Sequence, residues 1–152
     1  MKTLTNIITL AALIALPLTV MTAQTEKQLE GKTYQVVFEV SIDSAEKWLG
    51  VLRNVENVQK ALGVKTTNLE VIAHGKGIGL LLVKTSIEHP DLQAILKKLH
   101  GDGVVFAGCE NTMKRMALEK KDLIEQATTV DSGVAEVIRK QGAGWAYIKA
   151  GS

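Results

Sequence analysis

The side chain with the clearest chemistry in this sequence is its only cysteine, Cys109. It follows an apolar run at residues 104–107 and precedes helix-forming residues, so we predict a buried strand that ends at Gly108 and a helix that begins at Cys109. The free N–H groups and the positive dipole end of a helix favour an anion. The position therefore favours a reactive thiolate, and the alternative interpretation is a small buried hydrophobe. The neighbouring Glu110 opposes ionisation, because an adjacent carboxylate raises the pKa of a thiol.

A glycine-rich loop over residues 74–79, His-Gly-Lys-Gly-Ile-Gly, is the second candidate segment. It lacks the ending of a phosphate-binding P-loop and the spacing of a dinucleotide fingerprint. Its glycines permit tight turns and let backbone N–H groups face a small anion. His74 is a candidate proton donor or acceptor near the thiol, and the alternative is a loop histidine bonded to backbone. We predict a pocket beside Cys109 lined by His74, Gly75, Lys76, Gly77, Gly108, Glu110 and Asn111.

Other catalytic constellations are weakly supported. The three histidines and Cys109 lack the close ligand spacing of structural zinc sites, so we expect no metal and no other cofactor. No nucleophile-elbow motif supports a hydrolase. Trp145 and Tyr147 are expected in the core or in a subunit interface.

The elements that must position these residues alternate between strand and helix. Branched and aromatic residues predict strands over residues 34–40, 69–73, 104–107, 128–130 and 145–148. Apolar spacing and capping residues predict helices over residues 44–62, 90–101 and 111–118, a helix from Ser132 through Ile138, a short helix that begins within residues 80–83 and a helical turn at residues 121–126. The alternation predicts an α/β fold with a mostly parallel sheet of about five strands and helices on both faces. Val105 and Phe106 should therefore be buried, and both candidate segments should lie at the carboxyl edge of the sheet, where ligands bind.

Residues 1–23 have the order of a secretory signal peptide. Lys2 precedes an uncharged apolar run that contains Pro17 and ends at small residues, which predicts cleavage after Ala23. Met21 stands where a cleavage site has a small residue, so an uncleaved anchor is the alternative. We expect a periplasmic or secreted protein that is not inserted in the membrane after cleavage.

The mature chain suits one compact domain. Removal of 23 of the 152 residues leaves 129, with residues 24–32 as a flexible lead-in and residues 33–152 as a single domain. Removal of Lys2 leaves 17 basic residues against 16 acidic ones, which argues against nucleic-acid binding.

Three segments resemble the DsrE/DsrF-like sulfur-relay family: residues 103–113 around Cys109, residues 71–78 around His74, and the ending at residues 130–148. The resemblance implies a three-layer α/β/α domain that assembles into trimers, hexamers or other homo-oligomers. It also implies that Cys109 carries a persulfide that passes between proteins. An export signal departs from the cytoplasmic setting of that family.

Two functions remain open on the sequence. In the first, Cys109 accepts sulfane sulfur from a small donor or a partner protein and passes it to another thiol. In the second, the protein is a non-enzymatic oligomeric module that binds a small ligand or supports assembly, and Cys109 is buried and inert.

Overall fold

The computed structural model describes residues 33–150. The predicted signal peptide and the lead-in lie outside these residues. Among the helices that the structure describes, none has the length and apolar character needed to cross a membrane.

Five strands alternate with helices along the described chain. The elements are β1 (Tyr34–Val40), α2 (Ala45–Leu62), the 3-10 helix η1 (Val64–Thr66), β2 (Thr67–Ala73), the 3-10 helix η2 (Gly75–Leu81), α3 (Val83–Glu88), α4 (Pro90–Gly101), β3 (Val105–Cys109), α5 (Glu110–Arg115), the 3-10 helix η3 (Lys120–Asp122), β4 (Ala127–Val130), α6 (Gly133–Gly142) and β5 (Ala146–Ala150).

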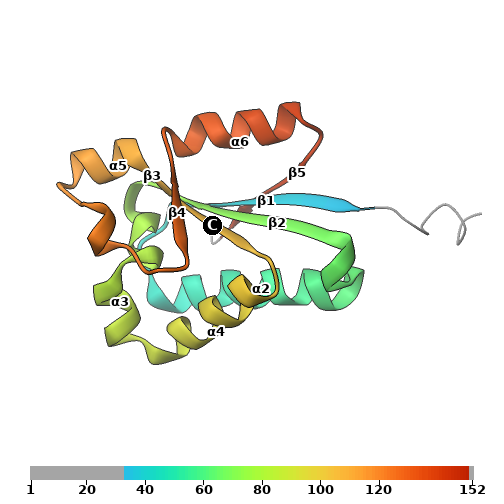
Figure 1. Ribbon diagram of the computed structural model, residues 1–152, viewed down its shortest axis with the longest axis horizontal. Helices are drawn as coiled ribbons and strands as arrows, with labels where there is room; N and C mark the ends of the chain where they lie inside the picture. Colours follow the sequence, from blue (N-terminus) through green and yellow to red (C-terminus); the bar gives the residue numbers. More distant parts are fainter. Residues whose placement is uncertain (1–32, 151–152) are drawn as a thin grey trace, which may run out of the picture. The chain divides into compact units, whose positions relative to one another are not determined.

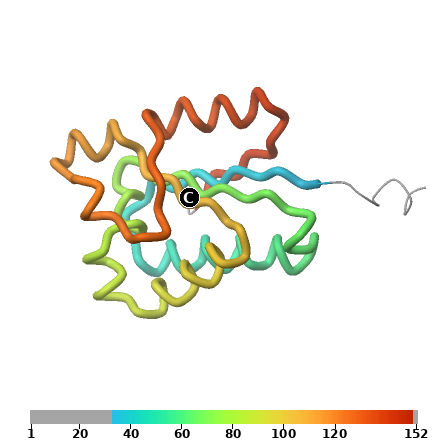
Figure 2. The backbone as a smooth tube through the Cα atoms, in the orientation of Figure 1, coloured from blue at the N-terminus to red at the C-terminus, as the bar shows by residue number. Residues whose placement is uncertain are grey.

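The strands form one parallel sheet in the order β4-β3-β2-β1-β5. Helix α6 covers one face of the sheet, and α2 and α4 cover the other (Figure 1). The backbone trace separates the same three layers, with α6 in red and α2 and α4 in blue-green and yellow (Figure 2). The predicted α/β class, the parallel sheet and the helices on both faces are therefore confirmed.

The two faces of the sheet contribute to cores of different size. The larger core lies on the side of α2 and α4 and includes the fully buried side chains of Phe38, Leu52 and Leu96. The smaller core lies under α6 and joins Val37, Ile72, Ala107 and Val137. One helix thus covers the face on which the candidate site lies.

Local sequence signals explain where the long helix α2 begins and ends. Ser44 is the N-cap, and its Oγ accepts a hydrogen bond of 3.3 Å from the N–H of Lys47. Gly63 follows the last turn with φ +90°, a conformation that favours glycine. These were the boundaries expected from the sequence.

Several predictions near the site need correction. Residues 75–81 form the 3-10 helix η2 rather than an irregular loop, whereas the short helix expected to begin within residues 80–83 is confirmed as α3, which begins at Val83. Strand β3 continues to Cys109, one residue past the predicted end, and α5 spans Glu110–Arg115 rather than residues 111–118. Phe106 is fully buried, but Val105 is 43% exposed: it is the first residue of β3 and lies on the same face as Ala107, which packs in the smaller core under α6.

Candidate functional site

The site lies where three neighbouring strands end. Strands β2, β3 and β4 are adjacent and parallel, so their carboxyl ends lie at the same edge of the sheet. Each is followed closely by a helical segment: η2, α5 and α6, respectively. Cys109 is both the last residue of β3 and the N-cap of α5, so its thiol lies at a helix N-terminus, as the sequence predicted.

The Cys109 side chain is buried, with 5% of its surface exposed, and it is surrounded by hydrogen-bond donors. Burial raises the pKa of the thiol. The N–H of Gly133, the hydroxyl of Thr112 and the N–H groups of Thr112 and Asn111 lower it. Together the donors outweigh burial, and the pKa lies below its ordinary value of 9.0. The chain therefore favours the thiolate without placing a positive side chain on it.

Thr112 is a functional residue that the sequence reasoning missed. It is buried, and its Oγ1 accepts a hydrogen bond of 3.0 Å from the N–H of Gly75. Because that bond uses a lone pair, the hydroxyl proton is available to the sulfur of Cys109. The available signal was its place three residues after Cys109, in the first turn of the helix.

Gly133, the first residue of α6, was also missed. It sits directly over the site, because a Cβ atom built on it would lie 3.0 Å from Cβ of His74 and 3.3 Å from Cβ of Cys109. The absence of a side chain lets the N-terminus of α6 approach the thiol. The sequence predicted only that Ser132 caps a helix. A helix cap does not indicate which strands lie next to the start of that helix, so the position of Gly133 over Cys109 could not be predicted.

His74 bonds a carboxylate through its ring. Its Nε2 lies 2.7 Å from Oε1 of Glu39, and the hydroxyl of Tyr147 donates to the other oxygen of that carboxylate. Burial raises the pKa of Glu39, but the hydrogen bonds from Tyr147 and His74 together lower it by more, so the net shift is downward. The same contact raises the pKa of Tyr147 to about 12. Tyr147 is thus partly exposed and bonded to Glu39 rather than a core residue.

The glycines after β2 serve close packing. A Cβ atom on Gly77 would lie 2.2 Å from the carbonyl oxygen of Val40, and one on Gly79 would lie 2.5 Å from the Trp48 ring. The N–H of Gly77 bonds the carbonyl of His74 at 2.9 Å and the N–H of Gly75 bonds Thr112. These two N–H groups are therefore used in hydrogen bonds within the protein and do not face a small anion, contrary to the prediction from the sequence.

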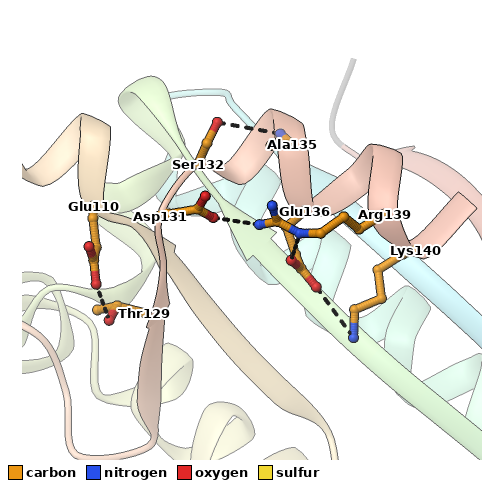
Figure 3. Close-up of polar contacts among 8 residues, drawn as sticks. All are labelled: Glu110, Thr129, Asp131, Ser132, Ala135, Glu136, Arg139 and Lys140. Atoms are coloured by element: carbon orange, nitrogen blue, oxygen red, sulfur yellow. Dashed lines mark hydrogen bonds and ion pairs between the residues drawn. The ribbon is translucent and has the colours of Figure 1, made fainter. Parts of the chain in front are cut away.

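The remaining predicted pocket residues fall into two groups. Gly108 is buried within β3, and the N–H of Asn111 bonds the carbonyl of Asp131 at 3.3 Å beside Cys109. Lys76 points to solvent with a side chain 77% exposed and pairs with Asp43 at 3.8 Å. The carboxylate of Glu110 instead accepts a hydrogen bond of 2.8 Å from the hydroxyl of Thr129 (Figure 3).

An ion-pair network holds α6 in place over the sheet (Figure 3). Arg139 pairs with Glu136 and with Asp131, which lies in the turn before the helix. Lys140 pairs with Glu136 and with the buried Glu70 of β2, and its Nζ lies 4.2 Å from the centre of the Trp145 ring. These contacts fix the helix whose first residue donates to Cys109.

Within residues 33–150, no three His, Cys, Asp or Glu side chains are grouped as a metal ion would require. The chemistry that the site offers is that of a thiolate surrounded by neutral donors, with an imidazole–carboxylate pair beside it.

Comparisons with known proteins agree with this architecture. The model of the DsrE/DsrF-like family matches residues 52–150. The solved structure of a protein of unknown function, MTH1491 from Methanobacterium thermoautotrophicum, is 33% identical with a TM-score of 0.69. The match covers 76% of this chain and 98% of that one. No curated protein matches the chain.

Proposed function

Because the chain belongs to the DsrE/DsrF-like family, we propose that it handles sulfur, with Cys109 as the residue that carries it. The family match supports a role in sulfur relay in general. The observation that carries the finer proposal is the thiol of Cys109 at the end of β3, where Gly133 and Thr112 lower its pKa. The thiolate is the nucleophilic form of cysteine.

The proposed step is a transfer of one sulfur atom without net oxidation. The thiolate of Cys109 attacks the outer sulfur of a persulfide or polysulfide, a bond forms between the two sulfur atoms, and the S–S bond of the donor breaks. The electron pair leaves with the thiolate of the donor. Attack by an acceptor thiol on the outer sulfur then regenerates the Cys109 thiolate.

A second function has its own support, because Cys109 is buried. In this alternative the protein is a homo-oligomeric binding or assembly module, and the thiol is inert. A groove of about 830 Å³ between α2 and β5, lined in part by Phe38, Val51, Leu62 and Ile148, offers apolar surface on the other side of the sheet. We propose a homo-oligomer, a trimer or hexamer, under either function.

We propose a periplasmic or secreted location, with cleavage after Ala23. The proposal rests on the apolar order of residues 1–23, which lie outside the described structure. A thiol partner would then have to operate in an oxidising compartment.

The experiment that separates the two functions is intact mass spectrometry of the protein after incubation with inorganic polysulfide. Sulfur carriage predicts a mass gain of one or more sulfur atoms that dithiothreitol removes, and Cys109→Ser should show no gain. Iodoacetamide should modify native Cys109. No mass gain, together with alkylation only after unfolding, would exclude the carrier and favour the assembly module.

A further inference from the structure

Three polar side chains that are distant in the sequence form a hydrogen-bonded group beside Cys109. Glu39 comes from β1, His74 follows β2 and Tyr147 comes from β5. The carboxylate of Glu39 joins the other two, with His74 Nε2 at 2.7 Å. The side chains of His74 and Glu39 are 18% and 17% exposed, so water only partly screens their interaction.

The carboxylate determines which ring nitrogen of His74 carries the proton. Tyr147 and His74 lower the pKa of Glu39, so the group is ionised at neutral pH and accepts hydrogen bonds only. The 2.7 Å contact therefore requires a proton on Nε2. In the neutral ring this leaves Nδ1 as the nitrogen with a free lone pair.

The strand register places His74 next to Cys109. The pairing of β2 with β3 ends at Ala73 and Gly108, so His74 and Cys109 occupy the next positions on neighbouring strands, whose separation is about 4.8 Å. Both Cβ atoms lie within 3.3 Å of the point where a side chain on Gly133 would begin. Because residue 133 is glycine, no side chain separates them.

We propose that Glu39 is a positioning residue that holds His74 to accept the proton of Cys109. The proton moves from the sulfur to Nδ1, which yields a thiolate and an imidazolium; no electrons are transferred. The carboxylate of Glu39 stabilises the imidazolium through Nε2. This inference rests on the proposed sulfur function, since it names the group that activates the thiol of that site.

The titratable groups around His74 come from the neighbouring elements. They are Glu39 on β1, Tyr147 and Lys149 on β5, Cys109 at the end of β3, the exposed Lys76–Asp43 pair, and the Asp131–Arg139 pair before and within α6. Glu39 is the charge in hydrogen-bond contact with the ring. Its removal should therefore have the largest effect on the imidazolium.

Two variants remove different bonds to the same carboxylate. Glu39→Gln removes the charge that holds His74, whereas Tyr147→Phe leaves that charge and removes its competing donor. We would measure the rate of iodoacetamide modification of Cys109 against pH, together with the ¹⁵N NMR signals of His74, in the full chain. Glu125→Gln, an exposed carboxylate before β4, is the control, and circular dichroism checks the fold of each variant.

The proposal expects opposite effects. Glu39→Gln should lose the preference for a proton on Nε2 and slow modification at neutral pH about tenfold, the effect of one pKa unit. Tyr147→Phe should keep the tautomer and speed modification, because the undivided carboxylate stabilises the imidazolium better. Equal slowing in both variants, or an unchanged Glu39→Gln, would overturn the proposal.

A failure of the sulfur function itself gives a different result. If native Cys109 resists iodoacetamide in every variant and gains no sulfur from polysulfide, the carrier function fails and the NMR signals decide the inference alone. Cys109→Ser should then remove the ¹⁵N signals of an imidazolium at His74 at neutral pH, since the proton that forms it comes from the thiol. Imidazolium signals that persist in Cys109→Ser would overturn the inference whether or not the protein carries sulfur.

Discussion

At the scale of single residues, neutral donors and burial act on Cys109 in opposite directions. The donors come from two places in the sequence: Gly133 at the start of α6, and Asn111 and Thr112 in the first turn of α5. Their combined effect keeps the thiol pKa below 9.0 even though the side chain is 5% exposed. A buried thiol with a low pKa can be ionised and still be inaccessible to a reagent. The fraction of thiolate and the accessibility of the sulfur must therefore be measured separately.

Replacement of Thr112 tests the donors directly. Thr112→Val keeps the shape of the side chain and removes its hydroxyl, and a hydrogen bond to a charged group contributes about 1.5–3 kcal/mol. Because this hydroxyl lowers the pKa of the thiol, we expect the pH midpoint of iodoacetamide modification to rise by about one unit relative to the parent. Thr112→Ser keeps the hydroxyl and should keep the low midpoint. An unchanged midpoint in Thr112→Val would exclude the hydroxyl as a donor.

The sequence identified Cys109 as the candidate residue but few of the groups around it. Cys109 was found from a strand followed by a helix, which is a local pattern. Thr112 and Gly133 lie at the site because β2, β3 and β4 end side by side. Glu39 and Tyr147 lie near it because β1 neighbours β2 and β5 neighbours β1. That strand order is not encoded in any short segment, so the partners had no local signal.

At the scale of elements, the start of α6 is the most constrained segment of the site. A methyl group on Gly133 would approach Ile72, His74 and Cys109 at 3.0–3.3 Å, so its neighbours would have to move. Gly133→Ala should destabilise the fold by about 1–3 kcal/mol, the usual cost of overpacking, and alter the alkylation rate of Cys109.

Gly142, near the other end of the same helix, is the matched control. A Cβ atom there meets nothing within 4 Å. Gly142→Ala should raise the free energy of unfolding by about 0.5–1 kcal/mol and leave Cys109 unchanged. Urea denaturation measures both variants. Equal stabilities of Gly133→Ala and the parent would show that the start of α6 is not closely packed against His74 and Cys109.

Strand β3 offers a test of which residues are enclosed. Phe106→Asp places a carboxylate in the core between the sheet and the α2 layer, so folded protein should be lost. Val105→Asp changes a residue that is 43% exposed and should alter stability by no more than about 1 kcal/mol. Thermal unfolding of the two purified variants checks this. A folded Phe106→Asp would contradict a central position for β3.

Element boundaries followed from the sequence where caps or punctuation residues define them. Ser44, Gly63 and Pro90 gave the limits of α2 and the start of α4. The function of the glycine loop was misjudged because Gly77 and Gly79 are needed for close packing against Val40 and Trp48. These two residues approach the glycines only in the folded molecule. Val105 was misjudged because an apolar run does not reveal how far a single helix covers it.

At the scale of the whole molecule, one layer depends on a single helix and on an ion pair between its Lys140 and the buried Glu70 of β2. Lys140→Met would leave Glu70 without this cation, and because the Lys140 side chain is 22% exposed, the loss should be smaller than the cost of about 3–5 kcal/mol for a fully buried pair. The double variant Glu70→Leu, Lys140→Met should recover most of that loss. Urea denaturation of the single and double variants measures the coupling. Additive losses would mean that the pair does not hold α6 on the sheet.

The architecture itself was predictable from the sequence, because alternating strands and helices favour a parallel sheet covered by helices. The order β4-β3-β2-β1-β5 and the sharing of one face by α2 and α4 depend on tertiary packing. The same packing decides that the apolar groove lies beside β5, at an edge of the sheet.

The two tryptophans lie in different layers, which gives the protein a built-in optical reporter for each. Trp48 is buried in the α2 layer, donates to the carbonyl of Ile42 at 2.9 Å and touches Gly79 of the segment after β2. Trp145 is partly buried and packs against the smaller core, with the ammonium of Lys140 over its ring. Emission from a chain that retains only Trp145 therefore follows the release of α6, and emission from Trp48 follows the opposite face.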